Sequence, residues 1–349
     1  MNDQRLLDVR DLRVSFTTEE GVVHAVDGVS FSVDRGEILA IVGESGSGKS
    51  VSTMTLMGLT RSANASFEGT ATFDSTELIG AGEQELRRIR GARMAMIFQD
   101  PMSSLNPVYR VGDQIAEQIR VHDREISKAQ ATDRVVGLLE RVGIPRARER
   151  IRSYPHEFSG GMRQRVMIAM ALSCSPSLLI ADEPTTALDV TIQAQILNEL
   201  KTLRDETGAG IILVTHDLGV VADIADRVLV MYAGRVIEQG TLDEIFYDPQ
   251  HPYTWGLLGS ITRVDRDRSQ RLAAIGGLPP SLLAPPVGCH FRPRCPHAFE
   301  QCTQVPALTA RLTDAPSHLD RCWLEPKNKR ELRQVDGAIG LASEKTVIA

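Results

Sequence analysis

Residues 43–50 read Gly-Glu-Ser-Gly-Ser-Gly-Lys-Ser, and this octapeptide decides the fold. It matches the pattern G-x-x-x-x-G-K-S/T, in which glycines let backbone N–H groups converge on phosphate groups. An apolar run precedes it at residues 38–42, and a helical pattern follows at Val51–Leu59, which is the strand–loop–helix context that the motif requires. We therefore predict a phosphate-binding loop (P-loop) in which Lys49 reaches the β- and γ-phosphates of a nucleotide and Ser50 ligates Mg²⁺. The alternative is a chance glycine-rich turn.

Other segments predict the surrounding fold. Ser177–Ala181 and Ile211–Thr215 are apolar runs with the length of buried strands, and such runs between helical patterns indicate an α/β fold with a parallel sheet. Residues 110–150 are rich in helix-forming residues, and Gly143-Ile144-Pro145 predicts a break between helices. Residues 279–296 hold six of the chain's 17 prolines, so we expect irregular structure there.

Composition bounds the class of protein. The chain has 349 residues, 42% hydrophobic and 24% charged, which is typical of a globular protein with about two domains. The net charge of −6 argues against a nucleic-acid binder with a basic face. Apolar stretches such as Val166–Leu172 run about seven residues, whereas a membrane-spanning helix needs about 20. We expect no secretory signal at the N-terminus.

Two adjacent carboxylates, Asp182 and Glu183, follow the apolar run Leu178–Ala181. In P-loop ATPases, an aspartate at such a strand end holds Mg²⁺. The neighbouring glutamate can polarise the attacking water as a general base. Solvated carboxylates at a strand end are the alternative, which becomes weaker when Lys49 and Ser50 are present in the same chain.

Between these motifs, residues 158–165 read Phe-Ser-Gly-Gly-Met-Arg-Gln-Arg. This segment resembles the signature of the ATP-binding subunits of ABC transporters, with Phe158 in place of Leu and Met162 in place of Gln. In that family the signature of one subunit closes over ATP held by the P-loop of another. The resemblance therefore implies a head-to-tail dimer with two ATP sites, and contacts from Ser159 and the two glycines after it to the γ-phosphate.

Four smaller matches occur at positions that suit the same family. Gln99 resembles the Q-loop glutamine, which touches Mg²⁺ and water. Residues 187–189 (Ala-Leu-Asp) resemble the D-loop, which lies at the dimer interface. His216 resembles the switch histidine, which contacts the γ-phosphate. Phe16 sits where the family places an aromatic ring that stacks on adenine. Each alone has a structural alternative, and for Phe16 it is a buried core phenylalanine.

The resemblance implies a specific set of functional residues. The catalytic residues are Glu183, His216 and Gln99. The nucleotide is bound by Phe16, Gly43, Ser45, Gly46, Ser47, Gly48, Lys49, Ser50, Val51, Ser159, Gly160, Gly161 and Asp189. Mg²⁺ is held by Ser50, Gln99 and Asp182.

It also implies a P-loop NTPase fold of the RecA-like type, with a mainly parallel sheet and an N-terminal antiparallel β portion. The expected domains are an ATP-binding core at 1–100 and 166–240, an inserted α-helical subdomain at 101–165 that carries the signature, and a small irregular C-terminal extension at 241–349.

The C-terminal third refines the resemblance. His251-Pro252-Tyr253-Thr254 resembles a hallmark of the oligopeptide/dipeptide branch of ABC importers, as do Ser103–Pro107 and Tyr154–Glu157. Members of this branch import di- and oligopeptides, and relatives import nickel or glutathione. The implied partners are two transmembrane permease subunits, a second ATPase subunit or another copy of this chain, and indirectly an extracytoplasmic solute-binding protein. The implied location is the cytoplasmic face of the membrane, as a peripheral subunit.

Four cysteines, Cys289, Cys295, Cys302 and Cys322, lie within 34 residues in the pattern C-x5-C-x6-C-x19-C. Four thiolates suit a 4Fe–4S cluster or structural zinc, although zinc sites usually have closely spaced cysteine pairs, which are missing here. Some dipeptide-type subunits resemble this arrangement and carry a 4Fe–4S cluster. The sequence favours that cluster and leaves zinc and unliganded thiols as alternatives.

Two other functions compete with an importer ATPase. A soluble ABC ATPase that acts on DNA or ribosomes typically has two cassettes or a long coiled-coil insertion, and the sequence shows neither. A non-catalytic regulatory subunit would have a degenerate Glu183 or His216, and both residues are intact. We therefore expect an ATPase with no nucleic-acid partner.

Overall fold

The structure is a computed structural model that describes residues 4–100, 104–186, 188–260 and 275–335. The chain separates into two compact units. The first comprises residues 1–6, 33–38 and 80–214, and the second comprises residues 7–32, 39–79 and 215–349.

A parallel sheet lies at the centre of the first unit. Its strands follow the order β8 (Gly210–Val214), β7 (Leu178–Asp182) and β6 (Met94–Ile97). Every residue of the three strands is buried, as expected for parallel strands that are covered on both faces. The strands predicted at 177–181 and 211–215 are confirmed, with bounds that differ by one residue.

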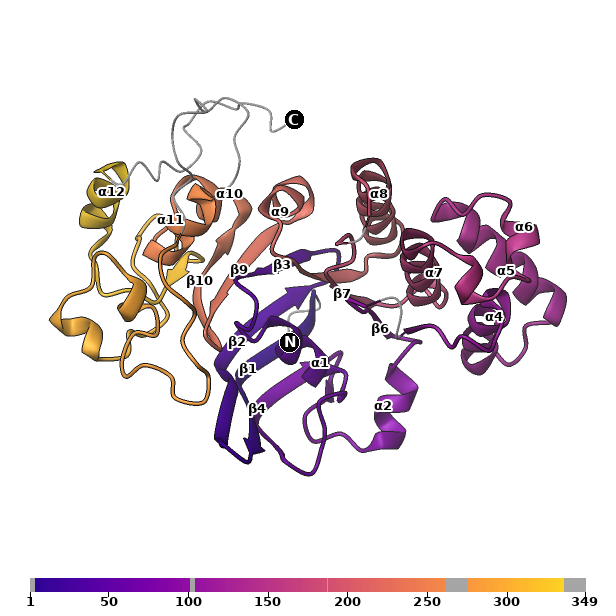
Figure 1. The fold of residues 1–349 in the computed structure, drawn as a ribbon, viewed down its shortest axis with the longest axis horizontal. Coiled ribbons are helices and arrows are strands. Elements are labelled where there is room, and N and C mark those ends of the chain that lie inside the picture. The colour runs from indigo at the N-terminus through magenta and orange to yellow at the C-terminus, as the bar shows by residue number, and fades with distance from the viewer. Residues whose placement is uncertain (1–3, 101–103, 187, 261–274, 336–349) are drawn as a thin grey trace. The chain divides into compact units, whose positions relative to one another are not determined.

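Helices make up most of the rest of the first unit (Figure 1). They are α2 (Glu83–Ile89), α4 (Val111–His122), α5 (Lys128–Arg141), α6 (Ala147–Arg150), α7 (Gly160–Leu172) and α8 (Val190–Thr207), with a 3-10 turn η1 at Pro155–Glu157. Helix α4 buries Val111, Ile115 and Ile119, which are spaced by four residues, and it packs with α5 and α7. The predicted break at 143–145 falls between α5 and α6.

The second unit contains an antiparallel sheet, as the resemblance implied. Its order is β2 (Gly21–Asp34), β1 (Arg5–Thr18), β4 (Ala65–Phe73) and β5 (Thr76–Glu77). Strand β1 pairs with β4 in a register that sets Phe16 opposite Ala65 and Leu7 opposite Phe73.

A mixed group of strands carries the P-loop in the second unit. Its order is β3 (Ile38–Val42), β9 (Arg227–Tyr232), β10 (Arg235–Thr241), β12 (Leu319–Asp320) and β11 (Thr309–Ala310). Strands β3 and β9 are parallel, and the other neighbours are antiparallel. Ala233 and Gly234 both have positive φ angles, which gives β9 and β10 the two-residue turn that matches the twist of a hairpin.

Short helices complete the second unit. They are α1 (Lys49–Leu56), α9 (Leu218–Ile224), α10 (Leu242–Tyr247), α11 (Pro252–Gly259) and α12 (Pro326–Val335), with 3-10 turns η2 (Arg292–Arg294) and η3 (Glu300–Thr303). Within residues 279–296, the only regular element is η2, so the irregular structure expected from the prolines is confirmed.

The C-terminal segments share a hydrophobic core with the strands that carry the P-loop. Tyr253 of α11 and Phe291 pack in one buried cluster with Val42 of β3 and Tyr232 of β9. Cys289 and Cys295 pack against the same cluster. The division into ATP-binding core, helical subdomain and extension stays a prediction.

Candidate functional site

The P-loop connects β3 to α1 in the second unit. Helix α1 begins at Lys49, two residues before the predicted start, and its N-cap is Gly48 in a left-handed conformation with φ 97°. An added Cβ at Gly48 would collide with the carbonyl oxygen of Ala25, and one at Gly43 would collide with that of Met231. Both positions therefore require glycine, because any other side chain would push the loop off the strands.

Lys49 is bound by the loop that precedes it. Its Nζ donates to the carbonyl oxygens of Gly43 at 2.7 Å and Glu44 at 2.9 Å. The side chain is buried although it carries a charge. A buried ammonium wrapped by backbone is suited to attract an anion such as a nucleotide phosphate. Ser50, half-buried, follows in the first turn of α1.

Two other predicted residues of the second unit, outside the P-loop, occupy accessible positions. Within the loop, Ser45 and Gly46 are exposed, Ser47 is buried and Val51 is half-buried. Phe16 is half-buried near the end of β1, so its ring is not enclosed in the core. His216 is exposed and lies just after β8.

In the first unit, the ends of β6 and β7 bring three polar side chains together. Glu183 follows β7 and has a left-handed backbone with φ 48°, and its N–H donates to the carbonyl oxygen of Val214. Its Oε2 accepts hydrogen bonds from Gln99 Nε2 at 3.1 Å and from Thr186 Oγ1 at 3.0 Å. Asp182, the last residue of β7, is 1% exposed. This arrangement fixes the direction of the Glu183 carboxylate. Thr186 was not among the residues that the sequence singled out.

The signature segment forms a helix N-terminus. Ser159 is the N-cap of α7, and its Oγ accepts from the backbone N–H of Met162 at 3.3 Å. Ser159 and Gly160 are exposed, whereas Phe158 is buried. The family's Leu and this chain's Phe therefore both suit an apolar position. Helix α7 begins six residues before the apolar run at 166–172, because that run is only its buried part.

The D-loop match is partly described. Asp189 is the N-cap of α8, and its Oδ1 accepts from the N–H of Ile192 at 3.0 Å. Ala187 lies outside the described residues, as does Ser103 of the Ser103–Pro107 segment. That all the predicted residues surround one nucleotide stays a prediction, as does each residue's role.

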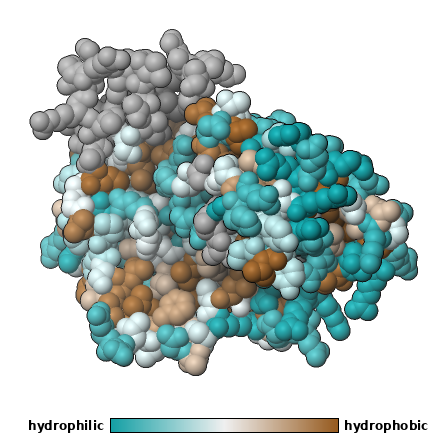
Figure 2. All heavy atoms as spheres, turned by 45° about the vertical axis from the view of Figure 1, so that its right-hand side comes forward, coloured by the Kyte–Doolittle hydropathy of each residue, from teal (hydrophilic) through white to brown (hydrophobic). Residues whose placement is uncertain are grey.

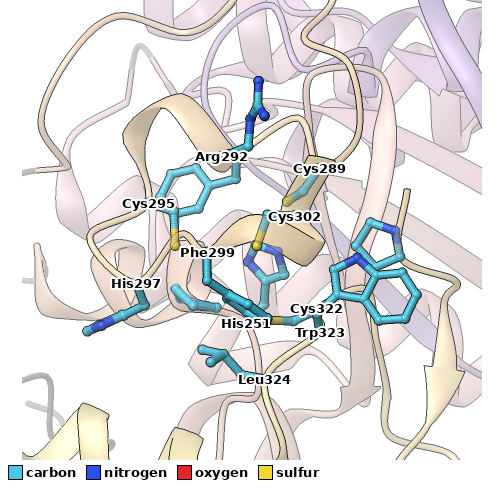
Figure 3. Close-up of a pocket in the computed structure, with 13 residues that line it drawn as sticks. His251, Cys289, Arg292, Cys295, His297, Phe299, Cys302, Cys322, Trp323 and Leu324 are labelled. Carbon is cyan, nitrogen blue, oxygen red and sulfur yellow. The ribbon is translucent and has the colours of Figure 1, made fainter. Parts of the chain in front are cut away.

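The four cysteines of the C-terminal segment line one pocket, together with His251, Phe291 and Trp323 (Figure 3). Burial raises the pKa of the Cys289 thiol and raises those of Cys295 and Cys322 to about 12. Across the described residues, no three or more His, Cys, Asp or Glu side chains are gathered closely enough to hold a metal ion. The four cysteines share one pocket, and their role as ligands of a cluster or metal stays a prediction.

Two residues that sequence reasoning did not place contact the P-loop at Glu44. Tyr253 Oη accepts from the N–H of Glu44, and Arg294 donates to its carboxylate. The signal that could have pointed to Tyr253 is the His-Pro-Tyr motif itself. No pattern in the sequence links Arg294 to a residue 250 positions away.

Helix length and surface hydropathy were compared with what a membrane-spanning segment requires. No helix among the described residues is long and apolar enough to cross a membrane. On the face drawn in Figure 2, hydrophilic side chains surround separate groups of apolar ones.

Two family models match the sequence. Residues 26–186 match the ABC transporter model, and residues 237–302 match the C-terminal region of oligopeptide/dipeptide transporters. The second match covers the His-Pro-Tyr motif and three of the four cysteines.

Similar proteins agree with these matches. The oligopeptide transport ATP-binding protein OppD of Salmonella typhimurium is 53% identical over 91% of this chain and 93% of its own length. The dipeptide transport ATP-binding protein DppD of Bacillus subtilis is 52% identical over 92% and 95%. Among solved structures, a dimeric ATP-binding cassette in a post-hydrolysis state with bound ADP and phosphate has a TM-score of 0.63 and 26% identity, over 68% of this chain and 99% of that one. The chain therefore belongs to the ABC transporter family, in the branch of the oligopeptide and dipeptide transport ATP-binding proteins.

Proposed function

We propose that this chain is the ATP-hydrolysing subunit of an ABC transporter that imports di- and oligopeptides. The observation that carries the proposal is the carboxylate of Glu183, oriented by Gln99 and Thr186 in a chain 53% identical to OppD. The names of the relatives favour peptides over nickel or glutathione as the solute.

The proposed mechanism assigns a role to each group. Glu183 accepts a proton from the water that attacks the γ-phosphate. Lys49 stabilises the negative charge that develops on the phosphate oxygens, and His216 contacts the γ-phosphate. Phe16 stacks on adenine. Ser159, Gly160 and Gly161 close over ATP that is held by another subunit.

The Mg²⁺ that accompanies ATP fits the oxygen ligands of this chain. Ser50, Gln99 and Asp182 offer a hydroxyl, an amide oxygen and a carboxylate, and hard divalent cations prefer such oxygens. The carboxylate of Asp182 is buried, so a cation would offset its desolvation. When bound, Mg²⁺ neutralises charge on the phosphates.

The proposed partners are two membrane permease subunits and a second ATPase subunit, either a related chain or another copy of this one. The solute-binding protein acts through the permease. The dimeric state of the similar solved cassette supports the pairing. We place the chain at the cytoplasmic face of the membrane through these partners.

The test is uptake of a labelled dipeptide by cells that lack other peptide transporters. Cells with the wild-type chain should accumulate the label, and cells with Glu183→Gln should show near-background uptake. The matched control is Glu206→Gln, because Glu206 is an exposed carboxylate of α8. Background uptake with the wild-type chain would refute the peptide assignment, whereas equal uptake above background by wild type and Glu183→Gln would refute the catalytic role of Glu183.

We further propose that Cys289, Cys295, Cys302 and Cys322 hold a 4Fe–4S cluster. Four thiols that line one desolvated pocket supply the usual ligand set.

The cluster is tested on full-length protein purified without oxygen. About four irons and four acid-labile sulfides per chain are expected, as for a 4Fe–4S centre. Cys302→Ser should lose them, and Cys174→Ser, which changes the one cysteine outside the pocket, should retain them. Stoichiometric zinc, or free thiols without metal, would contradict the proposal.

A further inference from the structure

Two residues of the C-terminal third, Tyr253 and Arg294, form hydrogen bonds with Glu44 of the P-loop. The backbone N–H of Glu44 donates to Tyr253 Oη at 2.8 Å. Its carboxylate accepts from Arg294 Nη1 at 2.7 Å and from Nη2 at 3.1 Å. Such a two-pronged pair fixes direction as well as distance. All three residues belong to the second unit, so these contacts lie within one compact body.

Arg294 is itself fixed on several sides. Its Nε donates to the carbonyl oxygen of Gly276 at 2.8 Å and its Nη2 to that of Ile275 at 3.2 Å. Its Nη1 also donates to Tyr232 Oη, and the guanidinium lies over the Tyr232 ring. The side chain is 6% exposed. A buried guanidinium with this many partners holds a single orientation, so it can define where the Glu44 carboxylate lies.

Tyr253 is held just as firmly. Its ring is fully buried and contacts the rings of Tyr232 and Phe291. His251 caps the helix that carries it, because His251 Nδ1 accepts from the N–H of Tyr253 at 3.1 Å. The His-Pro-Tyr segment therefore builds a rigid start of α11 that aims one hydroxyl at the P-loop.

The start of α11 is in turn anchored to β10. The carboxylate of Glu238 accepts from the backbone N–H groups of Gln250 and His251. It also pairs with His318 Nε2 at 2.7 Å. These groups are buried, so the anchor is protected from water.

Glu44 is also bonded to two residues of the phosphate-binding loop, Lys49 and Ser47. Its carbonyl oxygen accepts from Lys49 Nζ at 2.9 Å and from the N–H of Ser47 at 3.2 Å. The peptide N–H of Glu44 is therefore bonded to Tyr253 in the C-terminal third, and the peptide carbonyl of Glu44 is bonded to the lysine of the loop. A change in the position of Glu44 moves the oxygen that binds Lys49.

We propose that Tyr253 and Arg294 are positioning residues of the nucleotide site, which hold the P-loop through Glu44 in the conformation that binds ATP. The inference rests on the proposed ATPase function. It assigns a physical role to the tyrosine of the His-Pro-Tyr motif. Because Arg294 precedes Cys295, it also makes the cysteine segment part of the support of the P-loop.

Arg294 has a second effect through charge. It neutralises a carboxylate on a loop that must accept phosphates. Without it, Glu44 keeps a negative charge that repels the ligand, so we expect Arg294→Ala to weaken ATP binding about tenfold, the size of a lost hydrogen bond to a charged group. Arg294→Lys should recover only part of the loss, because an ammonium cannot make the two-pronged contact.

The experiment measures binding of a fluorescent ATP analogue and steady-state hydrolysis on the full chain. Tyr253→Phe and Arg294→Ala should each raise the dissociation constant, and KM should rise more than kcat falls. Glu44→Gln added to Arg294→Ala should restore part of the affinity by removing the uncompensated charge. The controls are Tyr247→Phe, a partly exposed tyrosine of α10, and Arg10→Ala, an exposed arginine of β1 that pairs with Asp8 and is far along the chain from the cysteine segment. Both controls should bind like wild type.

The outcomes separate the inference from the function on which it rests. If wild type binds ATP and the folded Tyr253→Phe and Arg294→Ala variants bind equally well, Arg294 and Tyr253 only attach the C-terminal third and the inference is wrong. If Arg294→Ala does not fold, Tyr253→Phe decides, because it removes one oxygen atom and keeps the packing. If wild type itself fails to bind ATP, the proposed function and the inference both fail.

Discussion

The side-chain amide of Gln99 donates a 3.1 Å hydrogen bond to the carboxylate of Glu183, although 84 positions separate them. The two residues follow neighbouring parallel strands, since β6 pairs with β7 and Ile97 lies opposite Ala181. Parallel strands end at the same edge of a sheet, so polar groups just beyond them meet. The carboxylate proposed to activate water is therefore oriented by the neighbouring loop.

Glu183→Gln should reduce ATP hydrolysis at least about 100-fold while ATP still binds, because an amide cannot accept the proton of the attacking water. Hydrolysis by the purified full chain and binding of a fluorescent ATP analogue measure the two effects. Glu206→Gln serves as the control. A Glu183→Gln variant that keeps more than a tenth of wild-type hydrolysis would show that another group is the base.

Thr186→Val should lower kcat roughly threefold to tenfold, the usual size of one lost hydrogen bond, and leave ATP affinity unchanged. Valine keeps the shape of threonine but removes the hydroxyl that bonds to Glu183 Oε2. The comparison variant is Thr132→Val, because the Thr132 hydroxyl donates to a carbonyl oxygen of its own helix, that of Lys128. An unchanged kcat in Thr186→Val would mean that this hydroxyl does not help to orient the carboxylate.

Gly48→Ala should abolish nucleotide binding and destabilise the chain by about 2 kcal/mol or more, because it adds a collision to a strained backbone. Gly208→Ala is the matched control, since Gly208 also has a positive φ of 68° but an added Cβ meets nothing within 4 Å. Its cost should be about 1 kcal/mol, the penalty of a left-handed alanine alone. Thermal unfolding measures the loss of stability in both variants. An equal loss in Gly48→Ala and Gly208→Ala would contradict the collision predicted at Gly48.

The buried pair of His318 and Glu238 should make stability depend on pH. Burial lowers the pKa of His318, but the hydrogen bond and charge of Glu238 outweigh it and raise the pKa above its usual value. A raised histidine pKa contributes stability that is fully present below the unfolded pKa, near 6.5, and is lost as pH rises through the folded pKa. His318→Gln should therefore cost about 3 kcal/mol at pH 6 and less at high pH.

Denaturant unfolding of wild type and His318→Gln at several pH values checks this dependence. The exposed histidine variant His24→Gln controls for general effects of the substitution. A cost of His318→Gln that grows with pH would reverse the predicted sign and rule out a charged pair.

Local chemistry explains what the sequence by itself determined. The glycines of residues 43–50, the apolar strand before them and the helical pattern after them act within one short segment, so the P-loop could be read directly. The same holds for the buried strands β7 and β8 and for the break at 143–145. Helix starts were less accurate, because capping by Gly48 and Ser159 begins α1 and α7 before their apolar residues.

Only the tertiary structure decided which distant residues meet. Glu44 looked like one of the variable positions of the P-loop motif, and Tyr253 like part of a family hallmark without a physical role. The fold brings Tyr253 to the backbone N–H of Glu44 and Arg294 to its carboxylate. The contacts of Glu44 with Tyr253 and Arg294 span 209 and 250 positions of the chain. They form because α11 and the cysteine segment pack against strands β3, β9 and β10, and no local pattern in the sequence encodes that packing.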